Sequence, residues 1–230
     1  MHSEASIFTG RLSIAADGRA EMAAGRAGCG GVPSAALAYA DAASRCGRIL
    51  LAATAEGVAW IGVHESVEYL ESELRSDYRH ASLRPQDPVA EGFLAELVAY
   101  LENSRRGLRL PIALRATPFQ LAVWRELCAI PRGRTRSYGE IASRLGRPAA
   151  VRAVGRANGA NPLAIAIPCH RVIGNNGGLT GYRWGIEIKR RLLAHEGALS
   201  AAAAPAATRR SAGDGLESSK FPQEPRLRKS

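Results

Sequence analysis

Cys169 and His170 are adjacent in the sequence, and they follow Pro168 at the end of an apolar run, residues 163–167. A free thiol has a pKa near about 8.5, so an imidazole that accepts its proton raises the share of reactive thiolate. Glu196 supplies a carboxylate that could orient this imidazole and balance its charge. A Cys-His pair is more commonly a buried, unreactive cysteine beside a hydrogen-bonded histidine. The pair therefore predicts nucleophilic chemistry only in a context that supports it.

Residues 137–158 have the pattern of a helix-turn-helix, with two short helices joined by a tight turn at residues 146–148. The second helix carries Arg152 and Arg156 among small residues such as Ala153. Small residues let a helix backbone approach DNA closely, and arginines contact phosphates or enter a groove. Two short helices with a glycine turn also occur in many all-α cores, so the pattern alone leaves both interpretations open.

The cysteine turn and the helix-turn-helix pattern occur together in the stretch Thr117–Gly197. This stretch contains the strings TPFQLAVWRELCAIPRGRTRSYGEIASRLG, AVRAVGRANGANPLAIAIPCHRVIG and GYRWGIEIKRRLLAHEG. It closely resembles the O6-alkylguanine-DNA alkyltransferases, and most of all their bacterial Ada/Ogt branch. The spacing from Asn161 to Cys169 and the string PCHRV after the helix-turn-helix pattern make the resemblance specific. Residues 36–114 are similar only in their order of strands followed by helices.

The resemblance implies that DNA containing O6-alkylguanine, and also O4-methylthymine, transfers its alkyl group irreversibly to the thiolate of Cys169. A base inside a duplex cannot reach a buried sulfur, so the nucleotide must be flipped out. By the same resemblance, His170 takes the thiol proton through a water, with Glu196 behind it. Tyr138 donates to N3 of the leaving guanine, and Asn161 ties the cysteine turn to the helix-turn-helix. The thioether product is a poor leaving group, so each molecule reacts once.

The resemblance also places the second helix of the motif in the minor groove of double-stranded DNA, with Arg152 filling the space of the flipped base. The DNA-contacting residues that it implies are Arg152, Ala153, Arg156, Ser137 and Gly159. The substrate-pocket residues that it implies are Val172, Tyr182, Arg183, Trp184 and Pro168. Backbone carbonyls of Cys169 and Val172 would accept the guanine amine. No cofactor or metal is expected. Multidomain relatives repair phosphotriesters with an N-terminal four-cysteine zinc module, and since only Cys29 and Cys46 precede the core here, that activity is not expected.

Two other classes of function compete with alkyl transfer. A Cys-His hydrolase would need an oxyanion hole, and the sequence lacks the context of a nucleophile elbow. A non-catalytic helix-turn-helix protein would explain Arg152 and the positive charge, but it leaves Cys169, His170 and Glu196 without a role. Alkyl transfer from DNA gives a role both to the Cys169, His170 and Glu196 group and to the helix-turn-helix pattern.

The composition favours a polyanionic partner. The 230 residues include 31 Lys and Arg against 21 Asp and Glu, a formal net charge of +10, and Lys and Arg release counterions from phosphates. No window reaches roughly 20 consecutive apolar residues and the N-terminus lacks a signal core, so we expect a cytoplasmic protein without membrane contact. We also expect a monomer. The cysteines have no C-x-x-C spacing and should stay thiols.

The order of predicted elements indicates an α+β fold with four segments. Residues 1–34 lack a sustained period and are expected to be a disordered extension, and residues 200–230 a disordered basic tail. Residues 35–114 are expected to form an N-terminal α/β domain, whose small antiparallel sheet is ribonuclease H-like by resemblance. Residues 115–199 are expected to form a mostly helical domain for DNA binding and catalysis.

Two apolar runs flank Glu56 and Gly57 and predict a hairpin of residues 49–54 and 58–63, with a third strand near 36–40. Residues 111–114 are expected to be a strand or an extended connector. Apolar spacing and capping residues predict helices over 66–76, 89–103, 118–129, 137–145, 149–158 and 186–196.

Overall fold

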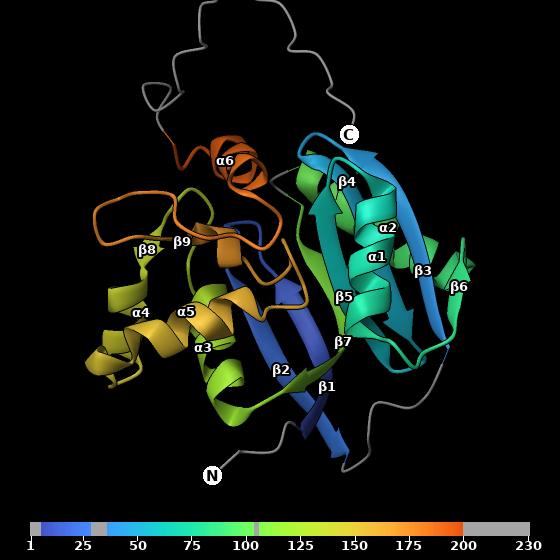
Figure 1. Ribbon diagram of the computed structural model, residues 1–230, viewed down its shortest axis with the longest axis horizontal. Coiled ribbons are helices and arrows are strands. Elements are labelled where there is room, and N and C mark those ends of the chain that lie inside the picture. The colour runs from blue at the N-terminus through green and yellow to red at the C-terminus, as the bar shows by residue number, and fades with distance from the viewer. Residues whose placement is uncertain (1–5, 29–35, 104–105, 200–230) are drawn as a thin grey trace, which may run out of the picture. The chain divides into compact units, whose positions relative to one another are not determined.

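The strands and helices gather around one large sheet in a computed structural model that describes residues 6–28, 36–103 and 106–199 (Figure 1). The sheet strands are β1 (Ser6–Ile14), β2 (Ala20–Gly28), β3 (Leu37–Ser44), β4 (Gly47–Thr54), β5 (Gly57–His64), β6 (Leu83–Pro85) and β7 (Leu108–Ala116). Their order in the sheet is β2-β1-β7-β5-β4-β3-β6. A separate short pairing joins β8 (Arg136–Ser137) to β9 (Val172–Ile173). The α-helices of the described residues are α1 (Val67–Asp77), α2 (Pro88–Glu102), α3 (Pro118–Cys128), α4 (Tyr138–Arg144), α5 (Val151–Gly159) and α6 (Ile186–His195).

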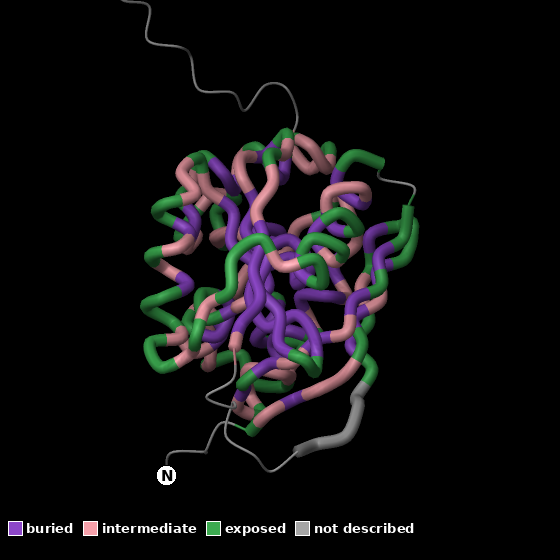
Figure 2. The backbone as a smooth tube through the Cα atoms, turned by 90° about the vertical axis from the view of Figure 1, so that its right-hand side faces the viewer, coloured by how far each residue is buried: buried purple, intermediate pink, exposed green. Residues whose placement is uncertain are grey.

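The predicted hairpin is present as β4 and β5, in the interior of the sheet. The two strands pair antiparallel from Arg48↔His64 to Thr54↔Gly57. At the turn Gly57 has a φ of +142°, and a Cβ there would lie 2.6 Å from the backbone of Pro111. Most residues of both strands are buried, and Figure 2 shows buried backbone at the centre of the molecule. The third predicted strand is also confirmed, because β3 pairs antiparallel with β4.

Helices α1 and α2 lie on one face of the sheet (Figure 1). Ser66 caps α1 by accepting from the Tyr69 amide, and Asp87 caps α2 by accepting from the Val89 amide. Both helices confirm the predicted spans to within about two residues, a normal margin for helix ends. The side chains that they bury are Leu70, Leu74, Ala90, Leu94, Leu97, Tyr100 and Leu101.

The prediction of a disordered extension over residues 1–34 is wrong for residues 6–28. These residues form the β1–β2 hairpin, and β1 pairs antiparallel with β7 from Ser6↔Ala116 to Ile14↔Leu108. Alternate β1 residues, Phe8, Leu12 and Ile14 among them, are buried. Polar and small residues between them weakened the apolar period, and one of the two strands that pair with β1, β7, lies about a hundred residues later. The rest of 1–34, and the whole predicted tail 200–230, lie outside the described residues.

The sheet is also larger than the small antiparallel sheet that was predicted, and it is mixed. β3 pairs parallel with β6, and β5 pairs parallel with β7 at Val58↔Ile112. The expected boundary between residues 114 and 115 is not a boundary in packing, since β7 runs across it and the chain up to Ser200 forms one compact unit. Both the mixed sheet and the absence of a packing boundary result from strand pairing over long sequence distances, which short-range sequence patterns do not reveal.

Capping boxes start two helices of the C-terminal half where the sequence predicted them. Thr117 and Gln120 exchange hydrogen bonds at the start of α3, and Ser137 and Glu140 do the same at the start of α4. α4 packs against α5 across a turn in which Gly146 has a φ of +68°. α5 begins two residues later than predicted, because residues 148–150 form a 3₁₀ turn. Among the described residues, no helix is long and apolar enough to cross a membrane.

The segment before Cys169 runs along β5. The Ile61 amide donates to the Pro162 carbonyl at 2.8 Å, and the Ala164 amide donates to the Ile61 carbonyl at 3.1 Å. Next in this segment, Ile165 has a φ of +71°, a conformation that costs a β-branched residue about 1–2 kcal/mol. Such strain persists only where surrounding contacts impose it, and here it lies four residues from the cysteine.

Candidate active site

Asn161 holds the strained segment together. Its Nδ2 donates to the Leu163 carbonyl at 3.3 Å and to the Ile167 carbonyl at 2.8 Å, and its Oδ1 accepts from the Leu163 amide at 3.0 Å. The same Nδ2 lies 3.0 Å from Sγ of Cys169. Asn161 is only 2% exposed, so one buried amide ties the end of α5 to the thiol.

Cys169 is a buried thiol at the start of a short 3₁₀ turn and is 5% exposed. Burial raises its pKa, and the hydrogen bond from Asn161 and the charge of Lys189 offset part of that rise. The resting group is therefore the protonated thiol near neutral pH. Nucleophilic attack requires a base that removes this proton.

His170 is the adjacent base candidate. Its Nε2 lies 3.1 Å from Oε1 of Glu196, and both side chains are buried. Burial raises the pKa of Glu196, but His170 and Arg171 outweigh that effect and hold it well below its usual range. Because the carboxylate is ionised, Nε2 carries the hydrogen that is shared with it, and in the neutral ring Nδ1 keeps a free lone pair. Nδ1 is buried and has no hydrogen-bond partner among the described residues.

The imidazole is neutral near pH 7 as well. Burial lowers the pKa of His170, and Glu196 only partly offsets this. A neutral ring with a free Nδ1 can accept a proton, whereas an imidazolium cannot. The tautomer and the protonation state that the structure favours are thus those of a general base.

A cavity of about 390 Å³ opens beside the thiol. This volume lies in the range of small-molecule sites, roughly 300–1,000 Å³. Of the predicted site residues, those that line the cavity are Cys169, Asn161, Tyr138, Gly159, Tyr182, Arg183 and Trp184. Burial raises the pKa of Tyr138 and raises that of Tyr182 well above its usual value, so both hydroxyls stay protonated and can donate.

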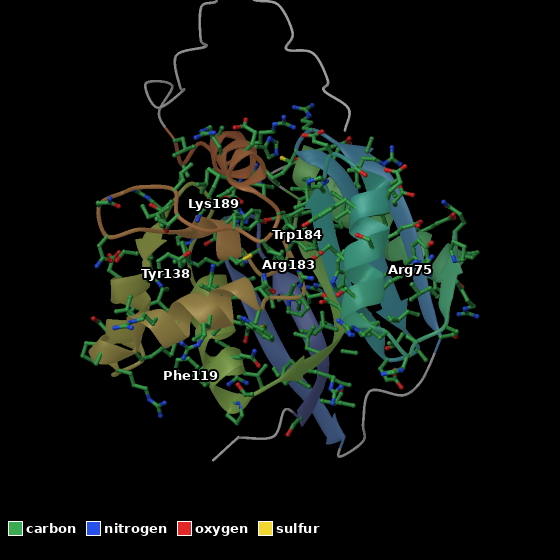
Figure 3. All side chains as sticks on the ribbon, viewed as in Figure 1. Arg75, Phe119, Tyr138, Arg183, Trp184 and Lys189 are labelled. Atoms are coloured by element: carbon green, nitrogen blue, oxygen red, sulfur yellow. The ribbon has the colours of Figure 1, made fainter. Side chains whose placement is uncertain are left out.

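The loop that closes one side of the cavity is fixed to α1. Arg183 forms ion pairs with Glu73 at 3.0 Å and with Asp77 at 2.7 Å. Trp184 is 2% exposed and packs edge-on against Trp60, with ring centroids 5.3 Å apart. Figure 3 shows Arg183 and Trp184 between the elements of the N-terminal half and those of the C-terminal half.

Lys189 is a site residue that the sequence analysis missed. It is fully buried, its Nζ donates to the Thr180 carbonyl at 2.8 Å, and burial lowers its pKa to about 8. Its charge favours the thiolate of Cys169. A signal existed, because Lys189 lies within the stripe that Ile188 and Leu192 define on α6, where a lysine is unexpected.

The remaining predicted residues lie outside the cavity. Pro168 and Val172 are buried at the two ends of the cysteine turn. Arg152 and Arg156 are exposed on α5, and Ala153 is partly exposed beside them. Ser137 lines a separate groove of about 840 Å³ at the start of α4. No group of His, Cys, Asp or Glu among the described residues is arranged to hold a metal ion.

Comparison with known proteins places this site in a family. A profile described as "6-O-methylguanine DNA methyltransferase, DNA binding domain" matches residues 118–198. The inducible methylated-DNA–protein-cysteine methyltransferase of Bacillus subtilis is 46% identical over 144 residues, which cover 62% of this chain and 80% of that protein. The chain belongs to the O6-methylguanine-DNA methyltransferase family. Members of this family transfer a methyl group from methylated DNA to a protein cysteine, as their names state.

Further comparisons agree with this family. The methylated-DNA–protein-cysteine methyltransferase of Salmonella typhimurium is 47% identical over 144 residues, covering 62% of this chain and 82% of that one. A crystal structure of Mycobacterium tuberculosis OGT in complex with DNA matches with a TM-score of 0.56 and 38% identity, covering 70% of this chain and 92% of that chain. The O6-methylguanine-DNA methyltransferase fold therefore extends over both halves of the described chain.

Proposed function

We propose that this protein repairs DNA by transferring the alkyl group of O6-alkylguanine to Sγ of Cys169, once per molecule. The observation that carries the proposal is a buried thiol that opens on a base-sized cavity and is followed in sequence by a neutral His170 backed by Glu196. The S–C bond forms as the bond between the alkyl carbon and O6 breaks. The resulting thioether has no proton to lose and is a poor leaving group, so the protein is not regenerated.

The proton transfers follow from the polar groups of the site. The Cys169 proton passes through a bridging water to Nδ1 of His170, whose free lone pair and buried position support this role. Glu196 stabilises the imidazolium that forms. The departing guanine gains electron density, and the Tyr138 hydroxyl in the same cavity donates to N3 to offset it. Lys189 adds a positive charge that favours the thiolate.

We infer that α4 and α5 form a helix-turn-helix that places α5 in the minor groove. Its exposed Arg152 fills the space of the flipped nucleotide, while Arg156 and Ser137 contact the backbone. Ala153 and Gly159 have small side chains, which permit close approach of α5 to the DNA. This arrangement would leave the mouth of the cavity, partly lined by α5, near the flipped base.

Recognition of the base uses groups that line the cavity together with the cysteine turn next to it. The backbone carbonyls of Cys169 and Val172 accept the guanine amine, and Tyr182 lies near enough to Cys169 for each to shift the pKa of the other. Pro168 fixes the turn that presents these carbonyls. Alkylated thymine at O4 offers the same kind of leaving oxygen, so we propose it as a second substrate.

The proposal also covers the fold of the N-terminal half, the oligomeric state and the cellular location. The partial order β5-β4-β3-β6, with β6 parallel to β3, supports a ribonuclease H-like N-terminal half. We also propose that the protein is a monomer, and the cysteines expected as thiols support a cytoplasmic location.

The decisive experiment is a mass measurement after mixing the protein with excess O6-methylguanine duplex. We expect one added methyl group, located on the peptide that contains Cys169, and one equivalent of repaired guanine. Cys169→Ser should give no adduct and should still bind the duplex, because the proposed DNA contacts come from other residues. Release of several product equivalents per protein, or a methyl group on another residue, would refute the proposal.

A further inference from the structure

The turn between β1 and β2 is hydrogen-bonded to two arginines, Arg171 and Arg132, that lie next to the proposed His170–Glu196 pair. The Gly18 carbonyl accepts from an Nη1 hydrogen of Arg171 at 2.8 Å, across 153 residues of sequence. The neighbouring Asp17 carbonyl accepts from the backbone amide of Arg132 at 3.1 Å. Two peptide carbonyls of an N-terminal turn are therefore bonded to the half of the chain that carries the thiol.

Arg171 joins this turn to Glu196. Its guanidinium is buried; Nε donates to Oε2 of Glu196 at 2.9 Å and Nη2 donates to Oε1 at 2.8 Å. Nη1 donates to the Gly18 carbonyl and also to the Ile130 carbonyl at 2.6 Å. A planar guanidinium fork that is bonded on both sides has little freedom, so the two carbonyls set the position of the carboxylate.

Oε1 of Glu196 is shared between two donors. It accepts from Arg171 and lies 3.1 Å from Nε2 of His170. Arg171 therefore fixes the oxygen that orients the imidazole, and it takes part of the negative charge that would otherwise act on His170 alone.

The β1–β2 turn packs closely against Arg132. Gly18 has a φ of +75°, and a Cβ at this position would lie 2.4 Å from Cβ of Arg132 and 3.0 Å from its backbone nitrogen. On its other side, Arg132 donates from Nη2 to the His195 carbonyl at 3.2 Å, one residue before Glu196. Only glycine permits this contact, which supports the end of α6 through a second route.

We propose that Arg171, held by the carbonyls of Gly18 and Ile130, is a positioning residue for the His170–Glu196 pair, and that the β1–β2 turn is thereby part of the catalytic apparatus. The proposal rests on the function proposed above. Neither Arg171 nor the turn lines the cavity, so the role does not require contact with DNA or with the departing base.

The proposal has a consequence for pH dependence. The charged groups that act on His170 are Glu196, Arg171 and Lys189. When Arg171 is displaced or neutralised, Glu196 acts more strongly on the imidazole, and only Lys189 still opposes it. The pKa of His170 then rises, so more of the ring is protonated near pH 6–7 and cannot accept the Cys169 proton. The loss of rate should be largest at low pH and should recover as pH increases.

The test compares single-turnover transfer from O6-benzylguanine between pH 5.5 and 9 in Gly18→Ala, Gly57→Ala and the unsubstituted protein. Both glycines lie in hairpin turns at positive φ, and an added Cβ would meet backbone or Cβ atoms within 3 Å in each case, but Gly57 faces Pro111 instead of Arg132. Thermal melting of each variant reports the structural cost separately. We expect both to melt earlier, and only Gly18→Ala to move the acid limb of the profile upward, by about half a pH unit or more.

Two substitutions at Arg171 complete the test. Arg171→Gln removes the charge and should move the acid limb further, while Arg171→Lys keeps the charge and should restore part of the profile. If Gly18→Ala does not fold, the comparison of the Arg171→Gln profile with the Arg171→Lys profile decides the question. Profiles of unchanged shape in the folded variants, with at most a uniform drop in rate, would overturn the proposal. Failure of the proposed function would look different, because the unsubstituted protein would then form no adduct at Cys169.

Discussion

Lys189 shows how a single residue serves the site at the expense of stability. An ammonium group that is fully buried, with one hydrogen bond to the Thr180 carbonyl, keeps little of its hydration energy. Its pKa of about 8, against an ordinary 10.5, means that folding disfavours the charged form. The unfolded chain therefore binds the proton more strongly, and the stability of the protein should rise as pH increases from about 8 to about 10.5.

We predict that Lys189→Met raises the free energy of unfolding at pH 7 by about 1–2 kcal/mol while slowing transfer to Cys169 roughly tenfold or more. Removing the buried charge removes its desolvation cost, but the thiolate loses a favourable charge. Denaturant titration and single-turnover rates measure the two effects. Arg190→Met, on the same helix and partly exposed, is the matched control and should change neither by much. A faster or equally fast Lys189→Met protein would show that the lysine has no part in thiolate formation.

At the scale of elements, α5 and the loop 181–185 both line the cavity but have different proposed roles. α5 presents Arg152 to solvent, and Asn161, two residues past the end of this helix, bonds to the cysteine segment. The loop is held by ion pairs from Arg183 to α1 and by the packing of Trp184. The proposed DNA-binding function and the shape of the pocket are thus carried by different elements and can be perturbed separately.

Arg152→Ala should slow repair of O6-methylguanine in duplex DNA by about 10- to 100-fold, because nothing then offsets the few kcal/mol needed to flip the base. Transfer from free O6-benzylguanine needs no flipping and should stay within about twofold. Arg75→Ala is the control, since Arg75 is also an exposed helical arginine, on α1 away from α5 (Figure 3). An equal loss on both substrates would mean that Arg152 supports the fold instead.

Asp77→Asn should loosen the loop that Arg183 holds. The amide oxygen can still accept from Nε1 of Trp60, but the ion pair at 2.7 Å is lost. We expect a loss of stability of about 0.5–1 kcal/mol, because the pair is partly exposed, together with a higher rate for benzyl relative to methyl substrates. Glu71→Gln, which affects only the bond from Tyr39, tests whether any charge change on α1 has this effect. The prediction is wrong if the benzyl-to-methyl ratio is the same in both variants.

For the whole molecule, we expect the net charge of +10 to dominate the encounter with DNA. Binding that neutralises phosphates releases counterions, so log K should fall linearly with log salt, with a slope of about −0.9 for each phosphate contacted. A filter or anisotropy measurement between 50 and 200 mM salt, on two duplexes of unrelated sequence, tests this. Affinity should fall steeply and almost equally for both duplexes. Binding that is insensitive to salt would contradict an electrostatic interface.

The local part of this structure is determined by the sequence itself. Thr117 with Gln120 and Ser137 with Glu140 predict helix starts because a capping box satisfies backbone amides within a few residues. The Glu56-Gly57 turn predicts the β4–β5 hairpin for a similar reason, since only adjacent residues are involved. The cysteine motif and its resemblance predicted the family, which the comparisons confirm. Each of these conclusions depends on interactions that close within a short stretch of chain.

Other features were decided only by the tertiary structure: the pairing of β1 and the burial of Lys189 and Arg171. β1 lies between its hairpin neighbour β2 and the distant β7, and the hydrogen bonding between strands as far apart as β1 and β7 leaves little trace in a local pattern. Whether Lys189 and Arg171 are exposed or buried depends on what packs over them, and both are charged residues that favour solvent until a paired environment is built. The sequence could name Cys169 and His170 as the candidate thiol and base. The carbonyl of Gly18 is brought to Arg171 only by folding, because a backbone carbonyl has no signature in the sequence.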